Sequence, residues 1–202
     1  MLLNTGLVLV SYLIGSIPTG LLLGRAFAKI DIREHGSHNI GATNVYRSAG
    51  KMLGILTLLG DTLKGFLPVY LVYTTTGSET WASLSALATF LGHLYPVYLK
   101  FSGGKGVATG LGVFLFLAPQ TLIFCLGIFC IVLALFRYVS LSSISAALAL
   151  PLLMIFSPHP YPWLYSATAA FLAIMIIFRH QENIKRLIKG EEHKIGGKVL
   201  KH

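Results

Sequence analysis

Residues 107–136 read VATGLGVFLFLAPQTLIFCLGIFCIVLALF and contain no charged side chain. A run of about 30 residues is longer than the roughly 20 that one helix needs to cross a bilayer, and Pro119 lies inside it. Proline removes a helical hydrogen bond, so the run forms either one kinked helix or two short helices. The choice decides the fold, because it sets the number of predicted membrane spans at six or seven.

The rest of the chain is equally apolar. Its 202 residues are 54% hydrophobic and 11% charged, whereas soluble domains carry roughly 25% charged residues. Further apolar runs occupy residues 2–24, 52–74, 81–99, 139–157 and 161–178. The longer of these runs match the thickness of a hydrocarbon core, so we predict an all-α integral membrane protein.

The basic residues distinguish six spans from seven. With separate helices at 107–118 and 120–136, every Lys and Arg except Lys64 lies on one side of the membrane. With a single helix there, Arg137 and the basic C-terminal segment would lie on the other side. Cytoplasmic loops carry the excess of Lys and Arg. We therefore predict seven transmembrane helices, an extracytoplasmic N-terminus and a cytoplasmic C-terminus.

The sequence predicts one domain over residues 1–202, because it contains no internal repeat, low-complexity stretch or long linker. Its formal net charge of +9 falls in loops next to the membrane and not in a separate basic domain. We therefore expect the charge to serve lipid surfaces and phosphates rather than nucleic acid.

Three polar patches lie on the predicted cytoplasmic side, at residues 36–47, 100–106 and 179–186. The first combines hydroxyl and amide side chains, a cation, and glycines that let backbone N–H groups turn toward a ligand. Its candidate anion-binding residues are Ser37, Asn39, Gly41, Thr43, Asn44 and Arg47. The alternative is an Asn- and Gly-rich turn that only joins two helices.

The second patch contains Gly103, Gly104, Lys105 and Gly106 directly before the apolar run that begins at Val107. Flexible backbone, a cation and a helix N-terminus meet there, and all three favour an anion. The patch is not a nucleotide-binding P-loop. Leu99 stands where the first glycine of that motif belongs, and a glycine follows the lysine in place of Ser or Thr.

The third patch begins where the last apolar run ends. On a continuing helix His180 and Asn183 share one face and can point into the bundle. Arg179, Lys185 and Arg186 are expected to reach toward the lipid surface. The alternative is an ordinary basic segment that ends a last span. Because three such patches share one side, we place an active site on the cytoplasmic face.

Other polar residues lie within or beside the spans. Asp61 and Lys64 are three apart and can pair on one helix face, either to stabilise the bundle or to serve function. His93 is interpreted as a hydrogen-bonding residue at a helix end. No metal is assigned, because the remaining histidines show no metal-ligand spacing. The histidines considered are His35, His38, His159 and His193.

Five segments resemble, in order, motifs of the bacterial acyl-phosphate-dependent glycerol-3-phosphate acyltransferases, a family of small seven-span enzymes. The segments are residues 11–18, 37–47, 92–109, 137–143 and 179–184. His38 departs from the first-patch motif, in which a small residue is usual. Two other lipid-enzyme signatures are absent: no His is followed five residues later by Asp, and no aspartate-rich cluster occurs.

The resemblance implies that a fatty acyl group passes from acyl phosphate to the 1-hydroxyl of glycerol 3-phosphate at the bacterial cytoplasmic (inner) membrane. The products would be lysophosphatidic acid and phosphate, with no covalent acyl-enzyme and no cofactor. The implied catalytic residues are Ser37, Lys105, His180 and Asn183. The implied substrate- and phosphate-binding residues are Asn39, Gly41, Thr43, Asn44, Arg47, Gly103, Gly104, Gly106 and Ser143.

Several points stay open at this stage. The proton acceptor is either His180 or a phosphate oxygen of the substrate. The rival function is a membrane transporter of a phosphorylated solute or lysolipid, which would place polar residues on both faces. Acyl-chain preference, oligomeric state, substrate order and docking with the soluble enzyme that makes acyl phosphate are left undecided.

Overall fold

The computed structural model describes residues 1–158 and 160–196. His159, Lys198 and Lys201, which entered the histidine and charge interpretation above, lie outside these residues. The described residues form helices and no strand. The helices are α1 Leu2–Gly15, α2 Thr19–Leu23, η1 Gly24–Ala28, η2 Ile32–Glu34, α3 Ala42–Ala49, α4 Lys51–Thr76, α5 Glu79–Leu94, η3 Val97–Leu99, α6 Val107–Leu117, α7 Pro119–Phe136, α8 Val139–Ile155, α9 Trp163–Arg179 and α10 Gln181–Lys189.

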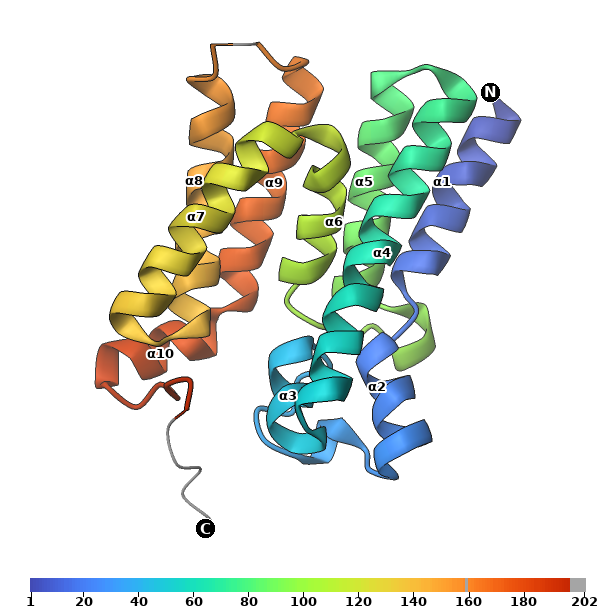
Figure 1. Cartoon of the computed structure of the whole chain (residues 1–202). Helices are drawn as coiled ribbons and strands as arrows, with labels where there is room; N and C mark the ends of the chain where they lie inside the picture. Colours follow the sequence, from blue (N-terminus) through green and yellow to red (C-terminus); the bar gives the residue numbers. More distant parts are fainter. Residues whose placement is uncertain (159, 197–202) are drawn as a thin grey trace.

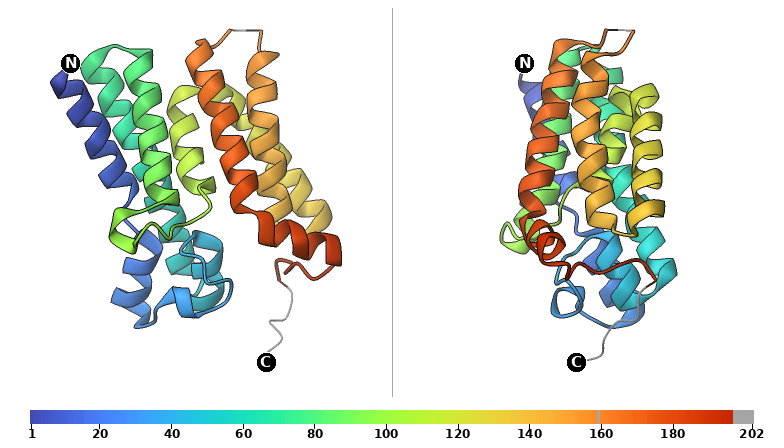
Figure 2. Two further views of the ribbon diagram at one scale, coloured as in Figure 1. Left: turned by 180° about the vertical axis from the view of Figure 1, so that it is seen from behind. Right: turned by 90° about the vertical axis from the view of Figure 1, so that its left-hand side faces the viewer.

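The longer helices run side by side and form a bundle (Figure 1). Helix α4 packs against α1, α5 and α6, while α8 packs between α7 and α9. The short helices α2, α3 and α10 gather at one end, and the N-terminus lies at the other (Figures 1 and 2). The main core joins both groups of helices through buried side chains such as Phe90, Phe114 and Leu172.

The stretch 107–136 forms two helices, as predicted. Helix α6 ends at Leu117 and α7 begins at Pro119, where the missing N–H of proline costs no helical bond. Helix α6 approaches α4 so closely that a Cβ on Gly112 would collide with the backbone of Thr62. Small residues at such contacts are typical of helices packed within membranes.

Two apolar runs are shorter or more bent than their sequence suggested. The run 2–24 is broken at residues 16–18, where α1 and the segment Thr19–Ala28 meet at 44°. The run 81–99 ends as a helix at Leu94, two residues before Pro96, because the residue before a proline is disfavoured in the helical region. These breaks place polar backbone at one end of the bundle.

Two helices, α4 and α7, are by themselves long and apolar enough to cross a membrane. Each of two bent pairs, α1 with Thr19–Ala28 and α9 with α10, could be a further span. Helices α6 and α8 are apolar but shorter. Large apolar side chains such as Ile131 and Leu135 are exposed on the bundle, as expected of a surface that faces lipid. The seven-span topology and its orientation stay a prediction.

The charged pair predicted within the fourth helix forms. Lys64 Nζ lies 2.7 Å from Asp61 Oδ1, and both side chains are buried. The same ammonium donates to the Ile17 carbonyl at 2.7 Å, at the break after α1. His93 Nδ1 lies 3.8 Å from Asp61 Oδ1. The pair therefore ties α4 to α1 and lies beside the end of α5.

Candidate active site

The glycine-rich loop between η3 and α6 is clamped from two sides. The Gly104 N–H donates to the carbonyl of His93 at 3.1 Å. Arg179 donates to the carbonyls of Gly103 and Gly104, at 2.8 and 3.1 Å, and its guanidinium stacks over Tyr95. The expectation that Arg179 reaches toward lipid is wrong, because the exposed loop carbonyls require a donor. The Gly104 N–H is likewise committed to the fold and not to an anion.

Three of the loop residues have to be glycine, and a Cβ on the first of them, Gly103, would collide with the carbonyl oxygens of His93 and Leu94. A Cβ on Gly104 would collide with the ring of His93. Gly106 adopts a φ of 85°, which other residues rarely reach, and α6 begins directly after it. This geometry places Lys105 between Gly104 and Gly106, at the N-terminal end of α6.

Lys105 joins the second and third patches. Its ammonium donates to Asn183 Oδ1. Burial lowers the pKa of Lys105 to about 8; Glu192 acts against this effect, whereas Arg186, Arg47 and Arg179 add to it. The ammonium therefore lies among other cations and is held in a partly dehydrated position that favours contact with an anion.

His180 lies at the junction of α9 and α10, and its side chain is buried. Its Nδ1 lies 2.8 Å from the carbonyl of Ile176. A carbonyl only accepts, so Nδ1 carries the proton and Nε2 of the neutral ring carries a lone pair. Burial, together with the charge of Lys105, lowers the pKa of His180 to about 4. The ring is therefore neutral near pH 7.

Glu192 was not among the candidates, yet its carboxylate lies at the centre of the cluster. Ser140 and Asn183 donate to its Oε1, both at 2.7 Å, and Arg186 donates to its Oε2 at 2.8 Å. Burial raises the pKa of Glu192, but these three hydrogen bonds outweigh burial and the pKa falls below its usual value. Arg186, too, points inward and not toward lipid as expected.

Arg47 brings the first patch to the same place. It lies on α3, and its Nη2 contacts the carbonyl of His193 at 3.4 Å. Burial lowers the pKa of Arg47, while Glu192 raises it. The structure thus brings Arg47, Lys105, His180 and Asn183 together in one cluster.

The remaining residues of the first patch bond mainly to one another. The Asn44 amide donates to the carbonyls of Ile32, His35 and Asn39, and its Oδ1 accepts the Ser37 N–H at 2.8 Å. Asn44 therefore shapes this loop.

Three further candidates of the patch have the following places. Asn39 Oδ1 accepts the N–H of Gly41, the residue that precedes α3. Thr43 is exposed on α3, four residues before Arg47 and so on the same face. Ser37 is also exposed.

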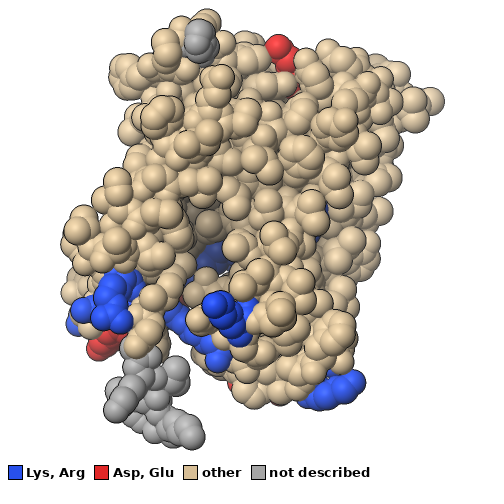
Figure 3. Space-filling model, in the orientation of Figure 1, with Lys and Arg blue, Asp and Glu red and all other residues tan. Residues whose placement is uncertain are grey.

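An apolar cavity of about 220 Å³ opens next to the cation cluster. Side chains of α6, α7, α8 and α9 line it, among them Val107, Ser143 and Ile176. The Ser143 hydroxyl donates to the Val139 carbonyl at 2.8 Å, which leaves its lone pairs toward other donors. Figure 3 shows a hollow in this face of the molecule, with Lys and Arg side chains below it. The cation cluster around Lys105 and the apolar cavity therefore lie next to each other.

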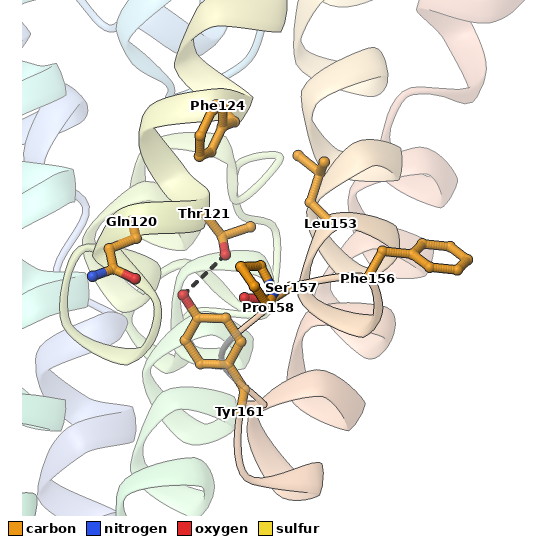
Figure 4. A pocket seen from close by; sticks show the side chains of 8 residues that line it. All are labelled: Gln120, Thr121, Phe124, Leu153, Phe156, Ser157, Pro158 and Tyr161. Atoms are coloured by element: carbon orange, nitrogen blue, oxygen red, sulfur yellow. Dashed lines mark hydrogen bonds between the residues drawn. The ribbon is translucent and has the colours of Figure 1, made fainter.

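A second cavity, of about 240 Å³, lies at the opposite end, between the start of α7 and the end of α8 (Figure 4). Gln120, Thr121 and Tyr161 contribute to its lining, and Thr121 donates to the Tyr161 hydroxyl at 3.0 Å. No residue that lines it is charged. Among the described residues, the lining of this cavity therefore offers no cation to hold a phosphate.

Sequence reasoning missed four residues of the site. Ser140 lay within a quoted motif but had no assigned role, and Glu192 lay outside every motif. Arg179 and Arg186 were expected to face lipid and not the site. One signal pointed to Glu192. A cluster of cations packed below a membrane requires a counter-charge, and few acidic residues are near it in the sequence.

Comparisons with known proteins identify the family of this chain. Residues 5–190 match the family model for glycerol-3-phosphate acyltransferase. The glycerol-3-phosphate acyltransferases of Trichlorobacter lovleyi and Syntrophotalea carbinolica are 52% and 50% identical, over 91% and 93% of this chain and 93% and 95% of theirs.

Two solved structures have the same fold. They are the glycerol 3-phosphate form and the lysophosphatidic acid form of PlsY, an integral membrane glycerol 3-phosphate acyltransferase. The first is 39% identical with a TM-score of 0.90 and 96% coverage of both chains. The second is 38% identical with a TM-score of 0.87, covering 95% of this chain and 94% of the other. This chain belongs to the glycerol-3-phosphate acyltransferase family of integral membrane proteins.

Proposed function

We propose that this acyltransferase uses acyl phosphate as its donor and transfers the acyl group to the 1-hydroxyl of glycerol 3-phosphate without a covalent acyl-enzyme. The products are lysophosphatidic acid and inorganic phosphate. The observation that carries the proposal is the junction of a cation cluster with an apolar cavity, at Lys105 and Val107. Two phosphates and one acyl chain require those two surroundings side by side. The solved relatives in glycerol 3-phosphate and lysophosphatidic acid forms support this choice of acceptor and product.

The residues divide between the two substrates. Lys105 faces the phosphate and carbonyl of the acyl phosphate, with Ser37 at the edge of the site. Arg47, Asn183 and Ser143 hold glycerol 3-phosphate and direct its 1-hydroxyl. The acyl chain lies in the apolar cavity between α6 and α9. Burying that chain favours binding by about 0.8 kcal/mol for each methylene removed from water.

The reaction needs positioning more than a strong nucleophile, because acyl phosphate is a mixed anhydride. The hydroxyl oxygen attacks the carbonyl carbon, the bond from that carbon to the phosphate oxygen breaks, and inorganic phosphate leaves. Lys105 stabilises the negative charge that develops on the carbonyl oxygen and on the leaving phosphate. Preorganised charge of this kind is often the largest contribution to catalysis.

The hydroxyl proton passes to a phosphate oxygen of the substrate. The second pKa of a phosphate monoester is about 6, whereas that of His180 is about 4 in the unliganded site. Burial thus makes His180 a weaker base than the phosphate of the substrate. The lone pair on Nε2 of His180 then orients the acceptor by accepting a hydrogen bond from the other hydroxyl of glycerol 3-phosphate, while the proton of the 1-hydroxyl stays directed to the phosphate.

The proposed setting is a bacterial cytoplasmic membrane, in a single domain that crosses it seven times. Lys and Arg gather at the end that holds α2, α3 and α10 (Figure 3). That distribution supports a cytoplasmic position for this end and for the active site. A cysteine-labelling experiment on residues 77 and 190 tests it, since the two positions should label from opposite sides of sealed vesicles.

Phosphate release from purified protein in detergent tests the donor. Synthetic acyl phosphate is supplied with and without glycerol 3-phosphate, and acyl-CoA and acyl carrier protein serve as alternative donors. Release that needs both substrates and yields lysophosphatidic acid is the expected result. Turnover with another donor alone refutes the donor, and no turnover with any donor from folded protein refutes the proposed reaction.

Labelling with radioactive acyl phosphate in the absence of acceptor tests the direct transfer. We expect no label on the protein after denaturation, because Ser37 is exposed and its N–H bonds to Asn44, with no base assigned beside it. A labelled protein that loses its label on addition of glycerol 3-phosphate would replace direct transfer with a two-step path.

A further inference from the structure

Glu192 is a carboxylate placed inside a site that has to bind anions. Its side chain is 5% exposed, and it accepts hydrogen bonds from Ser140, Asn183 and Arg186. A buried carboxylate opposes the binding of phosphate, because like charges at short range repel. A neutral acceptor would satisfy the two neutral donors without that cost. The negative charge therefore requires a reason of its own.

The backbone on both sides holds Glu192 in place. The Glu191 N–H donates to the Arg186 carbonyl at 2.8 Å. Ile195 exchanges two hydrogen bonds with Arg137, one from its N–H and one to its carbonyl, each 2.8 Å long. Residues 191–196 thus form a strap that links α10 to the start of α8. The position of the carboxylate is set by the fold and not only by its own contacts.

The chemistry of a carboxylate dictates which way its partners face. An ionised carboxylate only accepts hydrogen bonds, so Asn183 has to turn its NH₂ toward Glu192. The amide oxygen of Asn183 then faces Lys105, which donates to it. Ser140 has to spend its proton on Glu192 in the same way, which leaves the hydroxyl lone pairs for another donor. One carboxylate therefore fixes which group donates and which accepts in the series of hydrogen bonds that runs from Ser140 through Glu192 and Asn183 to Lys105.

We propose that Glu192 is a positioning residue of the acyl transfer, which fixes the amide of Asn183 and thereby holds the Lys105 ammonium in place for the substrate phosphate. The inference rests on the proposed function for the role of Lys105. It adds a residue, and the strap that carries it, to the site. Glu192 itself need not touch either substrate.

The charge of Glu192 supports the same role. Burial lowers the pKa of Lys105, and the surrounding cations Arg47 of α3, Arg179 at the end of α9 and Arg186 of α10 lower it further. His180, also beside Lys105, is neutral at the pH of the assay. Glu192 opposes these effects, so it keeps Lys105 charged where the reaction needs the charge.

Glu192→Gln tests the proposal, because glutamine keeps the shape but can present either a donor or an acceptor to Asn183. We expect kcat/KM for glycerol 3-phosphate to fall about tenfold to a hundredfold, the range for lost hydrogen bonds to a charged group. We also expect the loss of activity at alkaline pH to begin at a lower pH, since Lys105 loses its counter-charge. Glu191→Gln is the matched control, because Glu191 is exposed beside it, and it should change neither quantity.

Glu192→Asp separates charge from reach. It keeps the carboxylate but shortens the side chain by one methylene. Activity should therefore fall, while the pH at which activity is lost on the alkaline side should stay at the wild-type value. The proposal is overturned if Glu192→Gln folds, has the wild-type kcat/KM and loses activity at the same alkaline pH as the wild-type protein. Lower stability with unchanged kinetics per folded molecule also overturns it, since that result assigns Glu192 to the fold alone.

Ser140→Ala decides the matter if Glu192→Gln does not fold. It removes one donor to Oε1 without changing charge, and a loss of about fivefold in kcat/KM is expected; wild-type kinetics would overturn the proposal. All variants are assayed with whichever donor the wild-type protein uses. A wild-type protein that rejects acyl phosphate refutes that donor, and the comparison of Glu192 variants stands unaffected.

Discussion

Two groups of buried charges lie at different heights in the bundle, and they differ in balance. In α4 one cation faces one anion, Lys64 and Asp61, at 2.7 Å. At the end that holds α10, several cations surround a single carboxylate, that of Glu192. The first group is neutral as a unit. The second carries excess positive charge in a partly dehydrated place.

This difference separates a structural role from a functional one. Charges within a membrane are costly and point to function by default. The charges of the α4 pair instead neutralise each other, and Lys64 also donates to the Ile17 carbonyl. The cluster around Glu192 contains more cations than anions, and substrates with phosphate groups supply the missing negative charge. Unbalanced charge, and not buried charge as such, marks the site.

Lys64→Met should have the largest effect of these changes, and we expect that effect on the free energy of unfolding. It leaves Asp61 buried without its counter-ion, which typically costs about 3–5 kcal/mol. Unfolding in detergent, followed by helical circular dichroism, measures the loss. Asp61→Asn combined with Lys64→Met should recover most of it, because no buried charge then remains. If Lys64→Met is stable but inactive, the α4 pair belongs to the site and the comparison fails.

Lys105→Met should abolish most activity while the fold survives. Loss of one preorganised group that stabilises developing charge typically costs about 10²- to 10³-fold in kcat. Lys100→Met is the matched control, since Lys100 is an exposed lysine of the same loop. Steady-state kinetics of the two proteins give the ratio. Equal activity would remove Lys105 from the mechanism.

The sequence predicted the Asp61–Lys64 pair of α4 but only part of the cluster around Glu192, because the two groups are assembled differently. Asp61 and Lys64 are neighbours on one helix, so their spacing alone brings them together. Lys105, Asn183 and Glu192 come from three segments, and Glu192 arrives only because the chain after α10 folds back to Arg137. Helical periodicity contains no information about such a return.

The helices themselves were largely readable from apolar runs and proline. The division of residues 107–136 into α6 and α7 is confirmed. The break after α1 was missed, because Ser16 and Pro18 stand within an otherwise apolar run. The inward direction of Arg179 was missed too, since the carbonyls of Gly103 and Gly104 that attract it become unpaired only once the loop has formed.

The pH dependence should report the charge of Lys105. Its pKa of about 8 lies below the ordinary 10.5, so the protonated form is lost as the pH rises through about 8. We expect kcat/KM to fall about tenfold per pH unit above that value, because kcat/KM reports the free enzyme. Lys105→Arg should lower the plateau and remove this fall, since a guanidinium stays protonated.

The same titration has the opposite effect on stability, which provides a control. Between about pH 8 and 10.5 the unfolded chain binds the proton at Lys105 more tightly than the folded protein. The contribution of this group to the free energy of unfolding therefore rises with pH in that window. If activity falls above pH 8 while the midpoint of unfolding does not, the alkaline loss of activity comes from the active site and not from unfolding. An alkaline loss of activity that persists in Lys105→Arg would assign it to another group.

Arg179→Lys should have the smallest effect of the four. Arginine donates to two loop carbonyls at once, whereas an ammonium on a flexible stem reaches them less well. Loss of one such bond is worth about 1 kcal/mol, or about fivefold in kcat/KM. Lys185→Arg is the control, because Lys185 is exposed and pairs with Glu182 at the surface. A much larger loss for Arg179→Lys would mean that Arg179 acts on substrate directly, and that the functional cluster extends to the end of α9.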